Sequence, residues 1–346
     1  MLKQLPEPVA ANLIPPDLDR AYFDGCSTFP FSARADGCNF HNAWWLAEAS
    51  FAAYDDFDAT GHGRVNLNAL AQARYRVSSA TSGNTQFLAI ENDAVLIIAF
   101  RGTRVEGFSV PVLQTAPRVF SPNWGDVVTD AKFLPCKLSD GSFVHAGFLD
   151  AFEDVHTAVT GLINAAARQG RAIWLCGHSL GAAIATIAAY FNRATVQALY
   201  TFGSPRVGDG VFAEALLARV PNIYRFVHHR DVVTTVPPQG LPLGGGIAQW
   251  LPILGPLAGG EHGGYTHVGN AQYISGGKSS TIAEGEQALD RVGALAQFSF
   301  AHALESADAL ARGLATMNPD RWPLPFEVIA DHAPVYYANK IFNSFN

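Results

Sequence analysis

A serine flanked by two glycines stands where an apolar run gives way to a stretch of small residues. The motif is Gly177-His178-Ser179-Leu180-Gly181, between the apolar residues 173–176 and the alanine-rich residues 182–190. A serine hydroxyl is a weak nucleophile at neutral pH, so it must be lifted out of the backbone and given a base. A sharp strand-to-helix turn lifts it, and the two glycines leave room for that turn. The pattern therefore predicts a nucleophilic Ser179.

A nucleophilic serine needs a histidine that takes its proton and a carboxylate that orients the histidine. When the serine stands on such a turn, the acid and then the histidine follow it along the chain. Asp231 ends the predicted strand 223–227 and its short extension, so its carboxylate should reach the same rim as the serine. Asp209 is the alternative acid, but its place before a helical segment predicts a helix N-cap. Asp231 is therefore the predicted acid.

Eleven histidines compete for the role of base. His178 is discounted because adjacent side chains on a sharp turn diverge, and His228 and His229 precede the acid. That pair is expected to pack or cap rather than to bind a metal. His332 follows a short apolar run near the C-terminus, where the last strand of an α/β fold should deliver a base. Chain order leaves four candidates: His262, His267, His302 and His332.

Strand patterns alternate with helix patterns along the chain and predict how these residues are positioned. Such alternation indicates a largely parallel sheet that is covered by helices on both faces. Ligands of such sheets bind at the carboxyl ends of the strands, where Ser179 falls. We therefore expect a single α/β domain over residues 1–346. The predicted strands are 86–91, 94–100, 173–176, 198–202 and 223–227, and the predicted helices begin near Asn42 or cover 152–168, 182–190 and 211–217.

Three stretches do not belong to a minimal α/β unit. Residues 105–123 are rich in large apolar side chains and are broken by prolines, and residues 241–260 are almost without charge. Either both pack on the body as surface decorations, or at least one forms a mobile apolar cover over Ser179. Residues 283–314 have apolar residues at helical spacing, which predicts a packed helical insertion rather than a separate domain.

The composition and charge of the chain indicate which partners and which compartment can be expected. Hydrophobic residues make up 49% of the chain, charged residues make up 15%, and the net charge is −7 without a basic block. Nucleic acid is therefore not an expected partner. No signal peptide and no transmembrane run is recognisable, so we expect a cytoplasmic protein or export by a non-Sec route. Four cysteines define neither a disulfide framework nor a zinc site, although a bridge between Cys26 and Cys38 stays open.

Five motifs follow one another in an order and spacing that resemble the class 3 lipases of the filamentous-fungal triacylglycerol lipase type. The resemblance covers roughly residues 40–275 and resumes at 326–340. It implies an α/β-hydrolase fold with a mostly parallel central sheet, and a Ser-Asp-His triad that needs neither a metal nor another cofactor. The motifs are Phe100–Arg104, Val144–Phe148, Gly177–Ala183, Phe202–Gly208 and Asp231–Pro238.

The resemblance also assigns the triad. In that family the aspartate that opens the segment similar to Asp231–Pro238 is the acid, which agrees with the choice of Asp231. The base comes from a C-terminal segment of the Ala-x-His or His-x-x-Tyr type, and Asp331-His332 with Tyr336 resembles that segment. The resemblance therefore favours His332, with His267 as the runner-up.

An acyl-transfer site further needs hydrogen-bond donors for the oxyanion of the tetrahedral intermediate. The first donor is the backbone N–H of Leu180, which follows the nucleophile. The resemblance points to Thr103, the residue after Arg-Gly in the first motif, as the second donor. Thr103 also follows the apolar strand that ends at Phe100, so it should lie on the same rim.

The departures from the family lie in the insertions. Residues 105–123 are longer than the short helical lid of the fungal enzymes, and 241–260 and 283–314 have no counterpart there. The expected function is hydrolysis of carboxylic esters through an acyl-enzyme by a lipase acting on acylglycerols, with a lipid or small ester as substrate and transient contact with a lipid interface. An esterase or phospholipase is the nearest alternative. A non-catalytic lipid-binding protein of the same fold is the other, and the presence of all three triad residues argues against it.

Overall fold

The computed structural model describes residues 2–103, 135–235, 264–285 and 331–346, apart from positions 9, 14, 59, 194 and 221 and residues 277–279. The two expected cover segments, 105–123 and 241–260, lie outside these residues. So does the expected helical insertion from residue 286 onward. Its first two residues, Ala283 and Glu284, lie in the short strand β10 (Ile282–Glu284) rather than in a helix.

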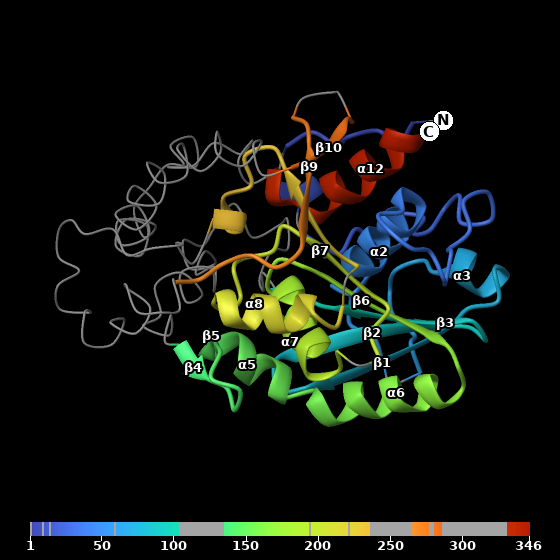
Figure 1. The fold of residues 1–346 in the computed structure, drawn as a ribbon. Coiled ribbons are helices and arrows are strands. Elements are labelled where there is room, and N and C mark those ends of the chain that lie inside the picture. Colours follow the sequence, from blue (N-terminus) through green and yellow to red (C-terminus); the bar gives the residue numbers. More distant parts are fainter. Residues whose placement is uncertain are drawn as a thin grey trace, which may run out of the picture.

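An eight-stranded sheet forms the centre of the described part, in the order β1-β2-β3-β6-β7-β8-β9-β10 (Figure 1). The five strands from β3 to β9 in this order are parallel, whereas β1 and β2 at one edge and β10 at the other pair antiparallel. The mostly parallel sheet predicted from the sequence is thereby confirmed. The remaining strands are β1 (Arg76–Ser82), β2 (Thr85–Glu91), β3 (Val95–Phe100), β6 (Ala172–His178), β7 (Ala198–Phe202), β8 (Ile223–His228) and β9 (Asn270–Ile274).

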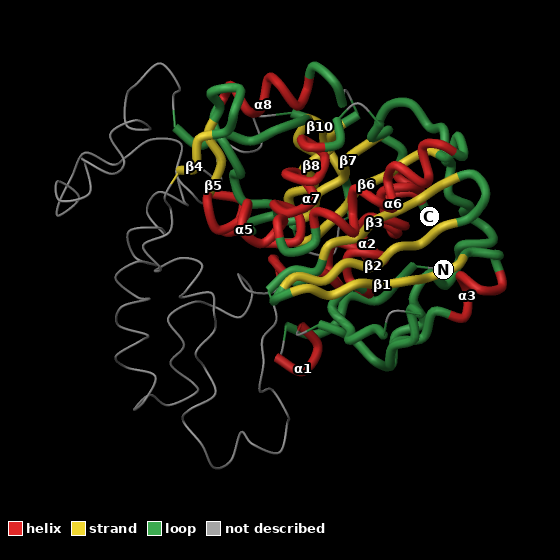
Figure 2. Tube along the Cα trace, turned by 90° about the horizontal axis from the view of Figure 1, so that it is seen from below, coloured by secondary structure: helices red, strands yellow, loops and turns green. Residues whose placement is uncertain are grey.

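Helices cover both faces of the sheet (Figures 1 and 2). In β3, Val95, Ile97 and Ala99 join the core that includes α2 and α12, whereas the alternate residues join the core of α5 to α8. A strand buried on both faces reads as a continuous apolar run, because successive side chains point to opposite sides. The helices are α2 (Phe40–Ala52) and α12 (Pro334–Phe345) on one face, and α5 (Ala146–Glu153), α6 (His156–Arg168), α7 (Leu180–Phe191) and α8 (Gly210–Leu217) on the other.

Smaller elements complete the described chain. The helix expected over 152–168 is two helices, since α5 ends at Glu153 and α6 begins at His156. All four cysteines are free thiols, so Cys26 and Cys38 do not pair. Within the described residues no helix has the length and apolar character needed to span a bilayer. The small elements are α1 (Ala10–Leu13), α3 (Asn68–Gln72), the antiparallel pair β4 (Pro135–Lys137) and β5 (Phe143–His145), and the 3₁₀ turn η2 (Val232–Thr235).

The N-terminal residues lie against α12 and α2, so the two ends of the chain are neighbours (Figure 1). The backbone N–H of Lys3 donates to the Asn343 side chain over 2.7 Å, and that side chain donates back to the Lys3 carbonyl over 2.8 Å. In the same region, the fully buried Glu48 of α2 accepts hydrogen bonds from Arg20 over 2.5 and 3.1 Å. A buried ion pair thus joins the N-terminal segment to the helix layer that also includes α12.

Glu48→Gln should lower the free energy of unfolding by about 3–5 kcal/mol, because it leaves Arg20 and Lys3 nearly buried without their anion. Burial alone would raise the pKa of Glu48, but the charges of Arg20 and Lys3 outweigh burial and lower it to about 2. The stability that this carboxylate contributes is therefore complete above the unfolded-state pKa of about 4.3 and is lost as the pH falls towards 2. Urea unfolding at pH 7 measures the effect.

Glu214→Gln, on the exposed side of α8, is the matched control and should change stability by less than about 0.5 kcal/mol. Equal stability of the two variants would contradict a net contribution from the buried pair.

Candidate active site

Ser179 stands at the junction of β6 and α7, on the sharp turn that the motif predicts. Its backbone has φ 59° and ψ −128°, a combination that L residues rarely adopt, and its N–H donates to the Phe202 carbonyl over 3.0 Å. A Cβ on Gly181 would collide with the carbonyl of Phe100, so the first turn of α7 can lie against the end of β3 only because this residue is glycine. Local strain of this kind, held by its surroundings, is typical of a functional residue.

Asp231 and His332 lie in direct contact although a hundred residues separate them in the sequence. Asp231 follows β8 and is fully buried, and His332 lies just before α12 with 8% of its surface exposed. The Nδ1 atom of His332 is 2.9 and 2.8 Å from the two carboxylate oxygens of Asp231. Because Nδ1–H donates to the carboxylate, Nε2 is the ring atom left to accept a proton. The structure thus brings the two predicted residues together in the arrangement that a triad requires.

Two further donors hold the carboxylate of Asp231. The hydroxyl of Tyr337 on α12 donates to Oδ2 over 2.6 Å, and the backbone N–H of Val233 donates to Oδ1 over 3.0 Å. Burial and the charge of Asp231 raise the pKa of Tyr337 well above its usual value, so the hydroxyl stays a donor. The sequence had pointed to the neighbouring Tyr336, whose hydroxyl donates instead to the Pro6 carbonyl over 2.7 Å. The spacing of Tyr337 and Ile341 on one buried helix face is the signal that could have identified it.

His178 connects the serine turn to the segment that carries His332. Its Nε2–H donates to the backbone carbonyl of His332 over 2.6 Å, and its Nδ1 accepts a hydrogen bond from the Tyr54 hydroxyl over 2.8 Å. Burial, with the nearby ring of His332, lowers the pKa of His178 well below its usual value. The ring is therefore neutral and can donate at one nitrogen while it accepts at the other. Sequence reasoning discounted His178 as the base and missed this supporting contact.

Thr103 lies on the same rim as Ser179. β3 and β6 are parallel with Phe100 opposite Gly177, which puts Thr103 just beyond the strand end beside the serine turn. A Cβ on the preceding Gly102 would crowd the carbonyl of His178, so the two segments touch. Within the described residues the Thr103 hydroxyl is buried and has no hydrogen-bond partner. The backbone N–H of Leu180 is the first of α7 and belongs to the donors that a helix N-terminus leaves without an intrahelical acceptor.

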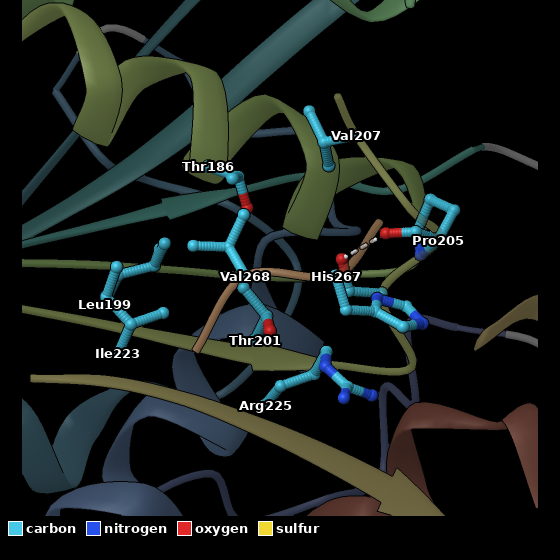
Figure 3. Close-up of a pocket in the computed structure, with 10 residues that line it drawn as sticks. Thr186, Leu199, Thr201, Pro205, Val207, Ile223, Arg225, His267 and Val268 are labelled. Carbon is cyan, nitrogen blue, oxygen red and sulfur yellow. Dashed lines mark hydrogen bonds between the residues drawn. The ribbon is translucent and has the colours of Figure 1, made fainter. Parts of the chain in front are cut away.

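The other candidates for acid and base lie elsewhere or outside the described residues. His267, together with Arg225 and Thr201, lines a separate cavity of about 10 Å³ (Figure 3), and its Nε2–H donates to the Thr234 carbonyl over 2.7 Å. Burial, with the charges of Arg225 and Arg206, lowers the pKa of His267 well below its usual value. Asp209 caps α8 by accepting a hydrogen bond from the Phe212 N–H over 2.9 Å, which confirms its predicted role. His262 and His302 are not among the described residues.

Acidic, histidine and cysteine side chains do not gather into a metal site anywhere in the described part of the chain. The polar groups around Asp231 are instead arranged as an acid, a base and their supports. This arrangement can take a proton from a hydroxyl and return it to a leaving group.

Parts of the chain are similar to known proteins. Residues 97–241 match the family described as Lipase (class 3). Secreted mono- and diacylglycerol lipase 1 of Fusarium solani is 40% identical over 122 residues, which are 34% of this chain and 36% of that protein. Phospholipase A(1) DAD1, chloroplastic, of Arabidopsis thaliana is 34% identical over 112 residues, or 29% and 25% of the two chains. Secreted mono- and diacylglycerol lipase A of Penicillium cyclopium is 30% identical over 176 residues, or 48% and 52%.

The matched part thus spans between a quarter and about half of the length of these relatives. Among solved structures, a crystal structure of fungal lipases has 24% identity and a TM-score of 0.49, with 70% of this chain and 81% of that chain covered. A mutant form of MDLA from Penicillium cyclopium has 25% identity, the same coverage and a TM-score of 0.47.

Proposed function

Because residues 97–241 match the class 3 lipase family, we propose that the chain is a serine hydrolase that cleaves carboxylic esters, and acylglycerols in particular, through an acyl-enzyme. The observation that carries this proposal is the contact of His332 Nδ1 with Asp231, at 2.8 Å, on the rim where the turn between β6 and α7 carries the buried Ser179. The expected substrate is a lipid or a small ester, and we expect the protein to contact a lipid interface transiently.

Each residue of the site has a definite task in this reaction. The Ser179 hydroxyl attacks the ester carbonyl while Nε2 of His332 takes its proton, and Asp231 stabilises the imidazolium without becoming protonated. His332 then gives the proton to the leaving alcohol, and the acyl group stays on Ser179. A water molecule attacks that acyl group by the same route and releases the carboxylic acid. The oxyanion formed in both halves accepts hydrogen bonds from the Leu180 N–H and the Thr103 hydroxyl.

Thr103→Val should lower kcat by about 10²-fold with little change in KM, because the hydroxyl acts mainly on charge that develops in the transition state. Valine keeps the shape of the side chain and removes only the donor. Steady-state kinetics with a soluble ester measures the effect, and Thr103→Ser, which keeps a hydroxyl, should stay close to wild type. A loss of less than about threefold in Thr103→Val would mean that only backbone N–H groups bind the oxyanion.

The experiment that tests the proposed function compares three substrates on the same protein. They are an emulsified long-chain acylglycerol, a soluble short-chain ester, and vesicles of a diacyl phospholipid. We expect release of fatty acid from the acylglycerol emulsion to be the fastest. Labelling of Ser179 by an organophosphonate, followed by mass spectrometry of the peptide, should occur in parallel. Absence of both hydrolysis and labelling would favour the non-catalytic alternative.

A phospholipase is the second candidate, and one specific observation favours it. The relative named phospholipase A(1) DAD1 is 34% identical over 112 residues. It would use the same Ser179 chemistry and differ only in how the polar head group is accommodated. Faster hydrolysis of the vesicles than of the acylglycerol emulsion would support this candidate over the lipase.

A further inference from the structure

The turn that carries Asp231 and the segment that carries His332 contact each other through a second carboxylate and imidazole. Asp331 directly precedes His332, and His229 lies two residues before Asp231. The Nδ1–H of His229 donates to Oδ2 of Asp331 over 2.9 Å. Each segment therefore supplies one carboxylate and one imidazole to the other. We propose that Asp331 and His229 are positioning residues that hold His332 against Asp231, a role that rests on the hydrolase function proposed above.

Three consecutive residues of the acid-bearing turn donate to Asp331. Besides His229, the backbone N–H of Arg230 donates to Oδ2 over 3.3 Å, and Nδ1–H of His228 donates to the backbone carbonyl of Asp331 over 3.0 Å. Burial lowers the pKa of His228 to about 4, so its ring is a neutral donor in this contact. Asp331 is only 7% exposed, so its carboxylate has little access to water that could replace these bonds. The Asp331 carboxylate is therefore held by several hydrogen bonds in a largely buried position, unlike a surface ion pair.

His229 itself has a backbone conformation that its surroundings must maintain. Its φ is 44°, in the left-handed region that non-glycine residues seldom adopt. Its N–H donates to the Ile274 carbonyl over 2.9 Å, and the N–H of Asp231 donates to the His228 carbonyl over 3.0 Å, which closes a tight turn. The side chain of Asp331 holds this turn from the opposite segment. Loss of that contact would let the turn relax. Asp231 would then move, because it lies two residues after His229.

The consequence for the reaction is geometric. Nε2 of His332 can serve Ser179 only while Nδ1 faces Asp231, and a misplacement of about 1 Å can cost up to 10²-fold in rate. His178 fixes the carbonyl on one side of His332, and the Asp331 contacts fix the residue before it on the other side. The peptide that carries the base is thus held on both sides. Asp331 does not touch the reacting atoms, and its effect passes through His332.

Three variants test the contact. His229→Phe keeps a ring but removes the donor, and His229→Asn returns a donor near the position of Nδ1 and tolerates the left-handed backbone. Asp331→Asn removes the charge but keeps the backbone carbonyl that His228 binds. Asp150→Asn, on the exposed surface of α5, is the matched control. The His229 side chain is 33% exposed, so its variants should fold even if Asp331→Asn does not.

The kinetic readout is kcat and KM on a soluble short-chain ester, per active site counted with an organophosphonate. His229→Phe and Asp331→Asn should each lower kcat about ten- to a hundredfold with KM within about twofold of wild type. The double variant should be no slower than the slower single variant, because both remove one interaction. His229→Asn should recover most of the rate. Unchanged kcat per active site in both single variants, or losses that multiply in the double variant, would overturn the proposal.

An NMR measurement does not depend on turnover, so it can test the positioning role independently of the proposed hydrolase function. The proton between His332 Nδ1 and Asp231 should give a low-field ¹H resonance, assigned by its loss in Asp231→Asn. That resonance should shift or broaden in His229→Phe and Asp331→Asn and stay unchanged in Asp150→Asn. If wild type hydrolyses no ester but the resonance responds in this way, the hydrolase function fails and the positioning role stands. If the resonance does not respond, the positioning role is wrong.

Discussion

Ser179→Ala should lower ester hydrolysis by about 10³-fold or more, because it removes the hydroxyl that forms the acyl-enzyme. Alanine has the same backbone strain as serine at φ 59°, so the turn between β6 and α7 should keep its shape. The measurement is the initial rate on a soluble ester, with circular dichroism to show that the variant is folded. Reaction with an organophosphonate should be lost in the same variant.

Ser204→Ala is the matched control for this prediction. Ser204 is also buried and follows the neighbouring strand β7, but its hydroxyl donates to the Pro205 carbonyl over 2.9 Å. Its replacement should change the rate by less than about tenfold. A variant that lacks the Ser179 hydroxyl and still forms a covalent adduct would show that the nucleophile is another residue.

The strands next to the site could be predicted well because they are buried on both faces. β7 was predicted over the residues that it occupies, and β3 and β8 within one residue at each end. β1 and β9 were missed because polar residues interrupt their apolar pattern. The sequence of β1 is Arg-Val-Ser-Ser-Ala-Thr-Ser, largely polar and partly exposed, and β9 contains Asn270 and Gln272. Pairing with a neighbouring strand makes these segments strands, and that information is not local.

The residues of the site also differ in whether a local sequence signal points to them. Ser179 and Asp231 could be found because the signal of each is local: a glycine-flanked serine after an apolar run and a carboxylate after a buried strand. The supports of the site, Tyr54, His178 and Tyr337, lie far apart in the sequence and meet only in the folded chain. Nothing in the residues around each of them indicates the partner. The sequence could therefore point to the candidate residues of the site but not to the contacts that hold them in place.

Chain order alone left four histidines as candidates for the base. The second large prediction decides between two of them, His332 and His267. His332→Ala should lower the rate by about 10³-fold or more, because the group that takes the proton from Ser179 is removed. His267→Ala should lower it by less than about tenfold, since His267 lines a cavity that neither Ser179 nor His332 lines and its Nε2–H donates to the Thr234 carbonyl. The two variants form a matched pair because each removes one largely buried imidazole. Initial rates on the same soluble ester measure both.

A small effect of His267→Ala would still be expected, and its cause can be identified. The Thr234 hydroxyl donates to the Asp231 carbonyl over 2.8 Å, so His267 supports the 3₁₀ turn that follows the acid. Loss of that support should lower the melting temperature more than it lowers kcat per folded molecule. His332→Ala should instead lower kcat per folded molecule, because it removes the nitrogen expected to take the proton from Ser179. Near-wild-type turnover in His332→Ala together with a collapse in His267→Ala would reverse the assignment and make His267 the base.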